Sequence, residues 1–234
     1  MKTALMILNI GDFLRENSRA SFHAAARRWG CDYVEVTEAH EGIHPHAMKL
    51  KAFDLCDADR IFYVDADAII SEECPNPFEA FPPDIFVAVP NQQPQMTESC
   101  RIACADNIMH DLRTITEHFG PINAQDVALF INAGFWIASR QYHEAMLKMA
   151  LEISLAMLGI TAWHDQSALN YALMKMQIPV LRLPETWNYQ FPPDTGAGEM
   201  TKFIYHWAGG ENRNRIPGVN WNRKKRLLWI GDAV

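Results

Sequence analysis

Hydrophobic runs of strand length alternate along the chain with segments whose apolar positions recur at helical spacing. Residues 3–10 are almost entirely apolar, and Phe22, Ala26 and Trp29 then recur at intervals of three or four before Gly30. A buried parallel strand is apolar on both faces, so the first run predicts a strand, while the spaced pattern ending at a glycine predicts a helix. The alternation predicts an α/β fold with a mostly parallel mixed sheet flanked by helices, and not a sandwich or a helical bundle.

Two segments depart from this simple alternation. Residues 129–138 are apolar but contain Asn132, Ala133 and Gly134, an interruption that favours two short strands meeting at a functional turn. Residues 75–83 are rich in proline and predict a loop. The remaining pattern predicts strands over residues 33–36, 60–64, 85–89, 178–183 and 202–206, and helices over residues 46–55, 106–118, 142–157 and 165–176.

The size and charge of the chain limit the classes of protein it can be. Its 234 residues, 49% of them hydrophobic, suffice for one large core, and no repeat or linker divides them, so we predict a single domain over residues 1–234. The net charge of -7 is spread along the chain, which argues against a protein that holds nucleic acid by its phosphates. No stretch approaches the roughly 18 consecutive apolar residues that cross a bilayer.

The cysteines and the last residues bear on where the protein works. Five cysteines without Cys-X-X-Cys spacing indicate reduced thiols and a cytoplasmic protein. Residues 218–234 form a basic and apolar tail, with four consecutive cations at residues 223–226. Such a tail suits peripheral contact with an anionic membrane at its inner face, or a solvated end with a short packed strand, and the sequence leaves both open.

The most informative motif is the acidic pair at the end of a strongly apolar strand. In IFYVDADAII, residues 61–70, Asp65 and Asp67 follow the strand, and their spacing allows both carboxylates to reach one site at its carboxyl end. Ligands of open α/β sheets collect at the carboxyl ends of strands. Hard carboxylate oxygens suit Mg²⁺ or Mn²⁺, which keep positions open for phosphate oxygens. The motif therefore predicts a divalent-metal site for a nucleoside diphosphate, with a solvated turn as the alternative.

Four further segments accompany this pair in a characteristic order. They are Lys49-Leu50 before it, Asn132-Ala133-Gly134 after it, Asp165-Gln166 at the start of a helix, and residues 205–209 with the sequence YHWAG. Together with the acidic pair they resemble the retaining glycosyltransferases of the GT-A fold, in particular the glycogenin-like and lipopolysaccharide-galactosyltransferase-like proteins. The resemblance spans residues 3–213. It implies a Rossmann-like GT-A domain.

The resemblance also implies roles for individual residues. It assigns Asp65, Asp67 and His206 to the metal ion, although His206 also fits a hydrogen-bonded core histidine. The family's basic donor contact falls on Lys49, with Lys51 as a competitor. The resemblance further implies donor binding by Asn9, Asp12, Lys49, Asp65, Ala66, Gly134, Gly209 and Arg213, and catalytic roles for Asp165, Gln166 and Asn132.

Two of these assignments have alternatives in the sequence itself. The family places a lysine on the diphosphate where this chain has Asn212, so either the neighbouring Arg213 or Lys202 from the preceding strand must neutralise the phosphates. Asp165 stands where a helix begins and is also a good N-cap residue. The histidines other than His206, including His44, His46 and His164, are interpreted as structural.

The expected activity is transfer of a hexose or related sugar from a nucleoside diphosphate sugar to a glycan or other hydroxyl acceptor. The resemblance implies Mn²⁺ or Mg²⁺ as cofactor, UDP as the nucleotide and retention of anomeric configuration. One alternative is a non-catalytic nucleotide-sugar-binding protein. Another is a haloacid-dehalogenase-like phosphatase, which also places Asp-X-Asp after a strand but requires a later acidic pair that the sequence lacks.

Overall fold

A computed structural model describes residues 1–11, 14–93, 96–122, 130–190 and 202–207. Within these residues a six-stranded mixed sheet has the order β2-β1-β3-β6-β5-β7. Strand β6 is antiparallel to both of its neighbours, and the other pairs are parallel. The strands are β1 (Thr3–Leu8), β2 (Asp32–Val36), β3 (Arg60–Val64), β5 (Phe86–Pro90), β6 (Ile131–Ser139) and β7 (Val180–Arg182). The predicted α/β class with a mostly parallel sheet is confirmed.

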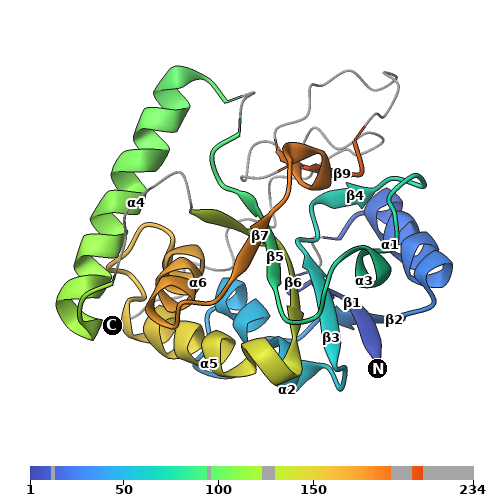
Figure 1. Cartoon of the computed structure of the whole chain (residues 1–234), viewed down its shortest axis with the longest axis horizontal. Coiled ribbons are helices and arrows are strands. Elements are labelled where there is room, and N and C mark those ends of the chain that lie inside the picture. The colour runs from blue at the N-terminus through green and yellow to red at the C-terminus, as the bar shows by residue number, and fades with distance from the viewer. Residues whose placement is uncertain (12–13, 94–95, 123–129, 191–201, 208–234) are drawn as a thin grey trace.

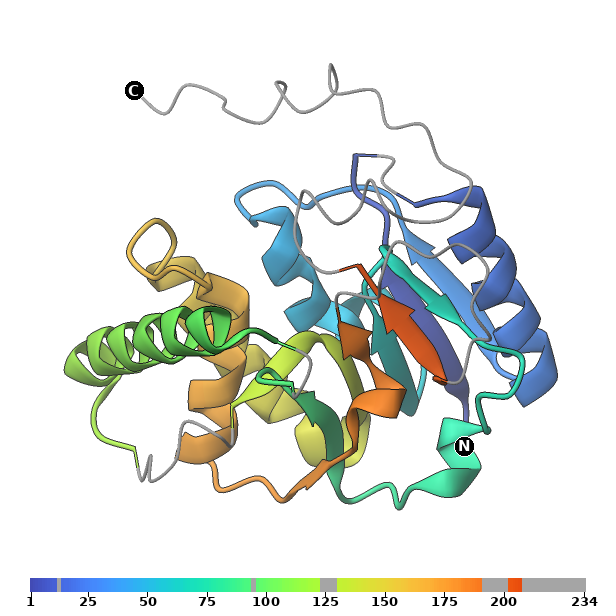
Figure 2. The ribbon, with the colours of Figure 1, turned by 90° about the horizontal axis from the view of Figure 1, so that it is seen from above.

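Helices cover both faces of this sheet. The α-helices are α1 (Glu16–Trp29), α2 (Ala52–Leu55), α3 (Pro77–Ala80), α4 (Glu98–Phe119), α5 (Arg140–Ala156) and α6 (His164–Lys175), and the 3₁₀ helices are η1 (Pro45–Lys51) and η3 (Glu185–Trp187). Figure 2 shows α1 in blue and α6 in gold on opposite sides of the strands.

The alternation of side chains along the strands explains this arrangement. In β1, Leu5 and Ile7 pack with α1, whereas Ala4 and Met6 pack with η1, α2, α5 and α6 on the other face. Successive side chains of a strand point to opposite faces, so a strand covered on both sides must be apolar throughout. Each fully buried large apolar side chain contributes roughly 1.5–3 kcal/mol to this core.

A small second sheet lies beside the carboxyl end of β3. It has the order β4-β9-β8 and consists of β4 (Ala68–Ile70), β9 (Ile204–His206) and β8 (Tyr189–Gln190). Strand β4 follows β3 after a tight turn and packs against α1. In Figure 1, β4 and β9 lie above β1 and β3, whereas α4 stands at the opposite side of the molecule beside α6. The second sheet brings the chain near residue 206 to the end of β3.

Three expected elements differ from the structure. Residues 131–139 form one strand and not two, because β6 pairs with β3 over residues 135–139 and with β5 at Ile131, Trp136 and Ile137. The register between β5 and β6 shifts between Ala88 and Pro90, beside the predicted interruption at residues 132–134. The proline-rich segment contains the one-turn helix α3, where Asn76 caps the start and Pro77 occupies the first turn. Helix α4 begins at Glu98, eight residues before the expected start, because the hydroxyl of Thr97 accepts a hydrogen bond from the backbone N–H of Cys100.

Several sequence-based expectations fall on residues outside the described ranges. These are the donor-binding roles of Asp12, Gly209 and Arg213, and the basic tail over residues 218–234 with its membrane contact. Among the described residues, no helix is both long enough and apolar enough to cross a membrane.

Candidate active site

The acidic pair lies where β3 ends, between β1 and β6 in the sheet. The backbone N–H of Asp65 donates to the carbonyl of Gly134 (2.9 Å), and the carbonyl of Asp65 accepts from the N–H of Ala68 (3.2 Å), which closes a turn. The carbonyl of Asp67 accepts from the N–H of Trp207 (3.0 Å). Backbone hydrogen bonds to β6 and to the end of β9 therefore fix both carboxylates.

His206 brings an imidazole to the same place from β9. Its Nε2 lies 3.1 Å from Oδ1 of Asp67 and 3.8 Å from Oδ2 of Asp65. One ligand atom from each of the three residues lies within 4.8 Å of the others. Ligands about 2.1 Å from an octahedral ion lie about 3 Å apart at right angles and about 4.2 Å apart across it, so these separations suit one divalent ion. Asp67 and His206 are 5% and 2% exposed.

A chain of amides orients the imidazole of His206. Oδ1 of Asn132 accepts from the backbone N–H of Gly134 (2.9 Å), which identifies this side-chain atom as the oxygen. The group of Asn188 that faces this oxygen is therefore its amide nitrogen, which donates to it (3.1 Å). This orientation turns Oδ1 of Asn188 toward Nδ1 of His206, 2.9 Å away. Because that oxygen can only accept, Nδ1 carries the proton, and Nε2 is the ring nitrogen that faces the carboxylates. Metal-binding histidines are commonly fixed in this way.

Gly134 leaves room for these side chains to meet. A Cβ atom at this position would lie 2.5 Å from Cε1 of His206, 2.6 Å from Oδ2 of Asp65 and 2.9 Å from Oδ1 of Asn132. Any other residue would therefore push the carboxylate and the imidazole out of position. The lack of a side chain at Gly134 therefore lets Asp65 and His206 approach each other, and its donor-binding role stays a prediction.

Lys49 bridges two carboxylates from inside the protein. Its Nζ lies 3.1 Å from Oδ1 of Asp65 and 3.2 Å from Oδ2 of Asp165. The hydroxyl of Tyr63 donates to the same Oδ1 of Asp65, which leaves Oδ2 for the side of His206. Lys51 instead lies with Nζ 3.2 Å from a ring nitrogen of the exposed His40, so Lys49 is the lysine that faces the site.

The charges of Lys49 and Asp165 stabilise each other. Burial alone would lower the pKa of the Lys49 ammonium, but Asp65 and Asp165 outweigh it and hold that pKa above its usual value. Burial would raise the pKa of Asp165, but Lys49, with His46 and His164, holds it below its usual value. Both groups are therefore charged at neutral pH.

The segment containing Asp165 and Gln166 meets β6. Oε1 of Gln166 accepts from the backbone N–H of Ala133 (2.9 Å) and from the amide of Asn132 (3.2 Å). Its Nε2 donates to Oδ1 of Asn91 (3.2 Å). Asp165 does not cap the helix, because α6 begins at His164 with its N-cap at Trp163. The N-cap alternative for Asp165 is wrong, since its side chain pairs with Lys49.

Two other predicted residues have different surroundings. The side chain of Asn9 donates to Glu35 (2.7 Å) and accepts from the N–H of Leu14 (2.7 Å), so both ends of its amide hold the loop after β1. Lys202, one of the two candidates for the diphosphate, lies 3.6 Å from a carboxylate oxygen of Glu185. Ala66 lies in the turn between the two aspartates.

Three polar residues around the site were not predicted from the sequence. Tyr63 had a usable signal, because residues two apart in a strand share a face and Tyr63 precedes Asp65 by two. Asn188 and Asn91 had none, since each contacts the site from a segment distant in sequence. Asn188 is fully buried, which is uncommon for an amide unless it is hydrogen-bonded.

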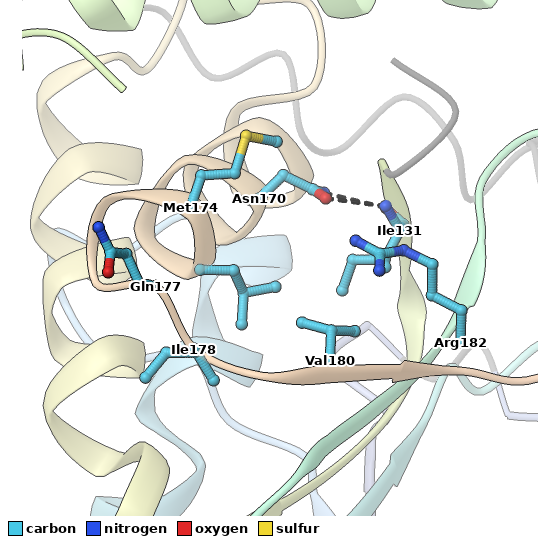
Figure 3. A pocket seen from close by; sticks show the side chains of 8 residues that line it. Ile131, Asn170, Met174, Gln177, Ile178, Val180 and Arg182 are labelled. Carbon is cyan, nitrogen blue, oxygen red and sulfur yellow. Dashed lines mark hydrogen bonds between the residues drawn. The ribbon is translucent and has the colours of Figure 1, made fainter. Parts of the chain in front are cut away.

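A small pocket lies elsewhere, between the C-terminal half of α6, the start of β6 and β7 (Figure 3). Asn170 donates to the carbonyl of Ile131 and accepts from its N–H, which ties α6 to β6 at the pocket wall. None of its lining residues is a predicted catalytic, donor-binding or metal-binding residue. We therefore do not assign the donor to this pocket.

Comparison with known proteins relates the chain to solved glycosyltransferase structures. No protein-family model and no curated protein matches the sequence. The structure superposes on a glycosyltransferase involved in glycosylation of the major capsid of PBCV-1, with a TM-score of 0.56 and 10% identity, over 92% of this chain and 97% of that one. It also superposes on the bifunctional glycosyltransferase WbbM, with a TM-score of 0.56 and 11% identity, over 96% of this chain and 51% of that one. The chain shares the fold of these glycosyltransferases.

Proposed function

We propose that the chain is a divalent-metal-dependent glycosyltransferase, which moves a hexose or related sugar from a UDP-sugar to a hydroxyl of a glycan or other acceptor, with retention of configuration. One observation carries the proposal: Asp65, Asp67 and His206 converge at the carboxyl end of a central strand in a fold shared with glycosyltransferases. That end of an α/β sheet is where ligands of such folds bind.

The residues of the site fit an ion of the Mn²⁺ or Mg²⁺ class. Oδ2 of Asp65, Oδ1 of Asp67 and Nε2 of His206 would hold it. The lack of a side chain at Gly134 allows Asp65 and His206 to lie close together. When bound, the ion supplies positive charge that stabilises the departing diphosphate. Asn188 keeps Nε2 of His206 directed toward the carboxylates.

The remaining polar residues have distinct proposed tasks. Lys49 fixes Asp65 and Asp165 and adds a buried positive charge beside the metal ligands. Asp165, which is charged, would orient the sugar and stabilise positive charge that develops at the anomeric carbon. Gln166 and Asn132 hold each other and the backbone of β6, so we propose that they position the site.

The test compares metal-dependent donor turnover in two matched variants. The chain is incubated with a panel of UDP-sugars and Mn²⁺, and released UDP is measured with and without candidate acceptors. Asp67→Asn removes a proposed ligand and should abolish turnover, whereas Asp54→Asn changes an exposed carboxylate on α2 and should leave it intact.

Each outcome decides between the proposal and its alternatives. Loss of turnover in Asp67→Asn and in excess chelator supports the proposed metal site. Tight UDP-sugar binding without hydrolysis or transfer would identify a non-catalytic binding protein. Turnover of the wild type that is unchanged in chelator would contradict the metal-dependent mechanism.

A further inference from the structure

A second group of metal-ligating side chains lies beside Asp165, separate from the acidic pair. His44, His46 and His164 each offer one ring nitrogen, and these atoms lie within 4.8 Å of one another. Nε2 of His164 is 3.2 Å from Nδ1 of His44. The ring centroids of His44 and His164 are 4.6 Å apart, and those of His46 and His164 are 6.1 Å apart.

The three rings come from two elements that pack against each other. His44 and His46 flank Pro45 at the start of η1, where Nδ1 of His44 accepts a long hydrogen bond (3.3 Å) from the backbone N–H of His46, which an ion bound at Nδ1 would replace. His164 is the first residue of α6, 120 positions away in sequence from His44. Proline fixes the backbone between the first two rings, and η1 contacts α6. Ligands on packed elements are held more precisely than ligands on a loop.

We propose that His44, His46 and His164 form a binding site for a transition-metal ion of the Zn²⁺ class, with a fourth coordination position open to solvent. Three imidazole nitrogens favour Zn²⁺, Co²⁺ or Ni²⁺ and disfavour Mg²⁺ and Ca²⁺, which prefer oxygen ligands. The site therefore differs in class from the acidic pair with His206.

The exposure of the cluster supports the open position. His46 is exposed, whereas His44 and His164 are half-buried, so solvent reaches one side of the group. Three protein ligands with a free fourth position are the arrangement of zinc sites that bind an exchangeable ligand, while structural zinc sites use four protein ligands. The fourth position would accept water or an oxygen of another molecule.

This proposal does not depend on the donor or the reaction proposed above. Its test therefore uses an untagged full-length chain in which Asp67→Asn weakens the acidic site, and measures metal binding and not turnover. After removal of metal by chelator, titration with Co²⁺ should show one equivalent bound with the visible absorption of four-coordinate cobalt. Zn²⁺ should displace it, and millimolar Mg²⁺ should not.

Two further variants identify the ligands. His46→Gln, at an exposed position, should weaken Co²⁺ binding at least about 100-fold, since even partners outside the coordination shell commonly contribute 10–100-fold to metal affinity. His110→Gln changes an exposed histidine of α4 and should leave the affinity unchanged. In the Asp67→Asn chain, Zn²⁺ should shift the imidazole ¹⁵N signals of three histidines together.

Two results would overturn the proposal. One is the absence of Co²⁺ binding by the Asp67→Asn chain, and the other is equal Co²⁺ affinity with and without His46→Gln. Either result would leave ring packing and the hydrogen bond between His44 and His164 as the reason for the cluster, whatever the outcome of the glycosyl-transfer assay.

Discussion

The two oxygens of Asp65 face different partners. Oδ1 accepts from Tyr63 and lies beside Lys49, whereas Oδ2 lies on the side of His206. A carboxylate fixed in this way offers one oxygen to an ion without having to rotate. This division depends on Gly134, because a side chain there would occupy the position next to Oδ2.

Replacing Gly134 with alanine tests whether metal binding depends on the close approach of Asp65 and His206. The new Cβ would lie under 3 Å from Asp65, Asn132 and His206, so the carboxylate and the imidazole must move apart. We expect Gly134→Ala to weaken Mn²⁺ binding at least about 10-fold, the lower end of the effect of disturbing ligand orientation. Mn²⁺ electron paramagnetic resonance measures the affinity. An unchanged affinity in a folded variant would contradict the assignment of these ligand atoms.

Lys49 and Lys51 provide a matched pair for the buried charge. Lys49→Met leaves Asp65 and Asp165 without their shared cation, and removing one partner of a buried ion pair costs about 3–5 kcal/mol. Since Asp65 is partly exposed, we expect about 3 kcal/mol of lost unfolding free energy in urea. Lys51→Met changes a half-buried lysine whose Nζ lies beside a ring nitrogen of exposed His40, and should change this free energy by less than about 0.5 kcal/mol. Equal losses in the two variants would contradict the assigned role.

At the scale of elements, sequence patterns predicted the presence of strands and helices better than the continuity of one strand. The run over residues 60–64 was recognised because a strand covered on both faces is apolar throughout. The same reasoning failed at β6, where Asn132 and Gly134 indicated a turn. Asn132 and Gly134 nevertheless belong to the strand. Asn132 contacts Asn188 and Gln166, and Gly134 leaves room for His206, and contacts between residues so distant in sequence leave no local pattern.

The junction between β6 and α5 predicts a pH dependence of stability. His143 is 1% exposed, and its Nδ1 accepts from the backbone N–H of Ser139 (2.9 Å). Burial first, and then the charge of Arg60, lower its pKa from the usual 6.5 to about 4. The folded protein therefore favours the neutral ring. Between pH 4 and pH 6.5, His143 binds a proton more readily in the unfolded chain than in the folded protein.

The stabilisation from neutral His143 is complete above pH 6.5 and is lost as the pH falls toward 4. This difference between the pKa of His143 in the folded protein and in the unfolded chain corresponds to about 2 kcal/mol of unfolding free energy lost between pH 7 and pH 5. His143→Asn keeps an oxygen acceptor for Ser139 but does not titrate, so urea unfolding of this variant should depend less steeply on pH over that interval. Identical slopes for variant and wild type would show that His143 does not titrate with unfolding.

At the scale of the whole molecule, the site is assembled from five elements. Asp65 directly follows β3, whereas Gly134 lies on β6, His206 on β9, Lys49 on η1 and Asp165 on α6. Asp65 was indicated by its place directly after an apolar strand, and the resemblance to GT-A glycosyltransferases indicated the other four. Asn188 and Asn91 could not be found in that way, because an amide that orients another side chain has no local pattern of its own.

The last prediction concerns the stereochemistry of transfer. Inversion needs a base for the acceptor hydroxyl, and a general base is most effective when its pKa lies near the operating pH. The carboxylate of Asp165 is a weak base, because Lys49 outweighs the effect of burial and holds its pKa below the usual value. We therefore expect retention, in which an oxygen of the departing diphosphate accepts the proton, and an α-linked product from an α-linked UDP-sugar.

Proton NMR of the product distinguishes the two outcomes through the coupling constant of its anomeric proton. Asp165→Asn keeps the shape of the side chain but removes its charge, so it should lower kcat at least about 100-fold if the carboxylate stabilises the developing positive charge. Retention should persist in whatever product this variant forms. A β-linked product from the wild type would contradict the prediction.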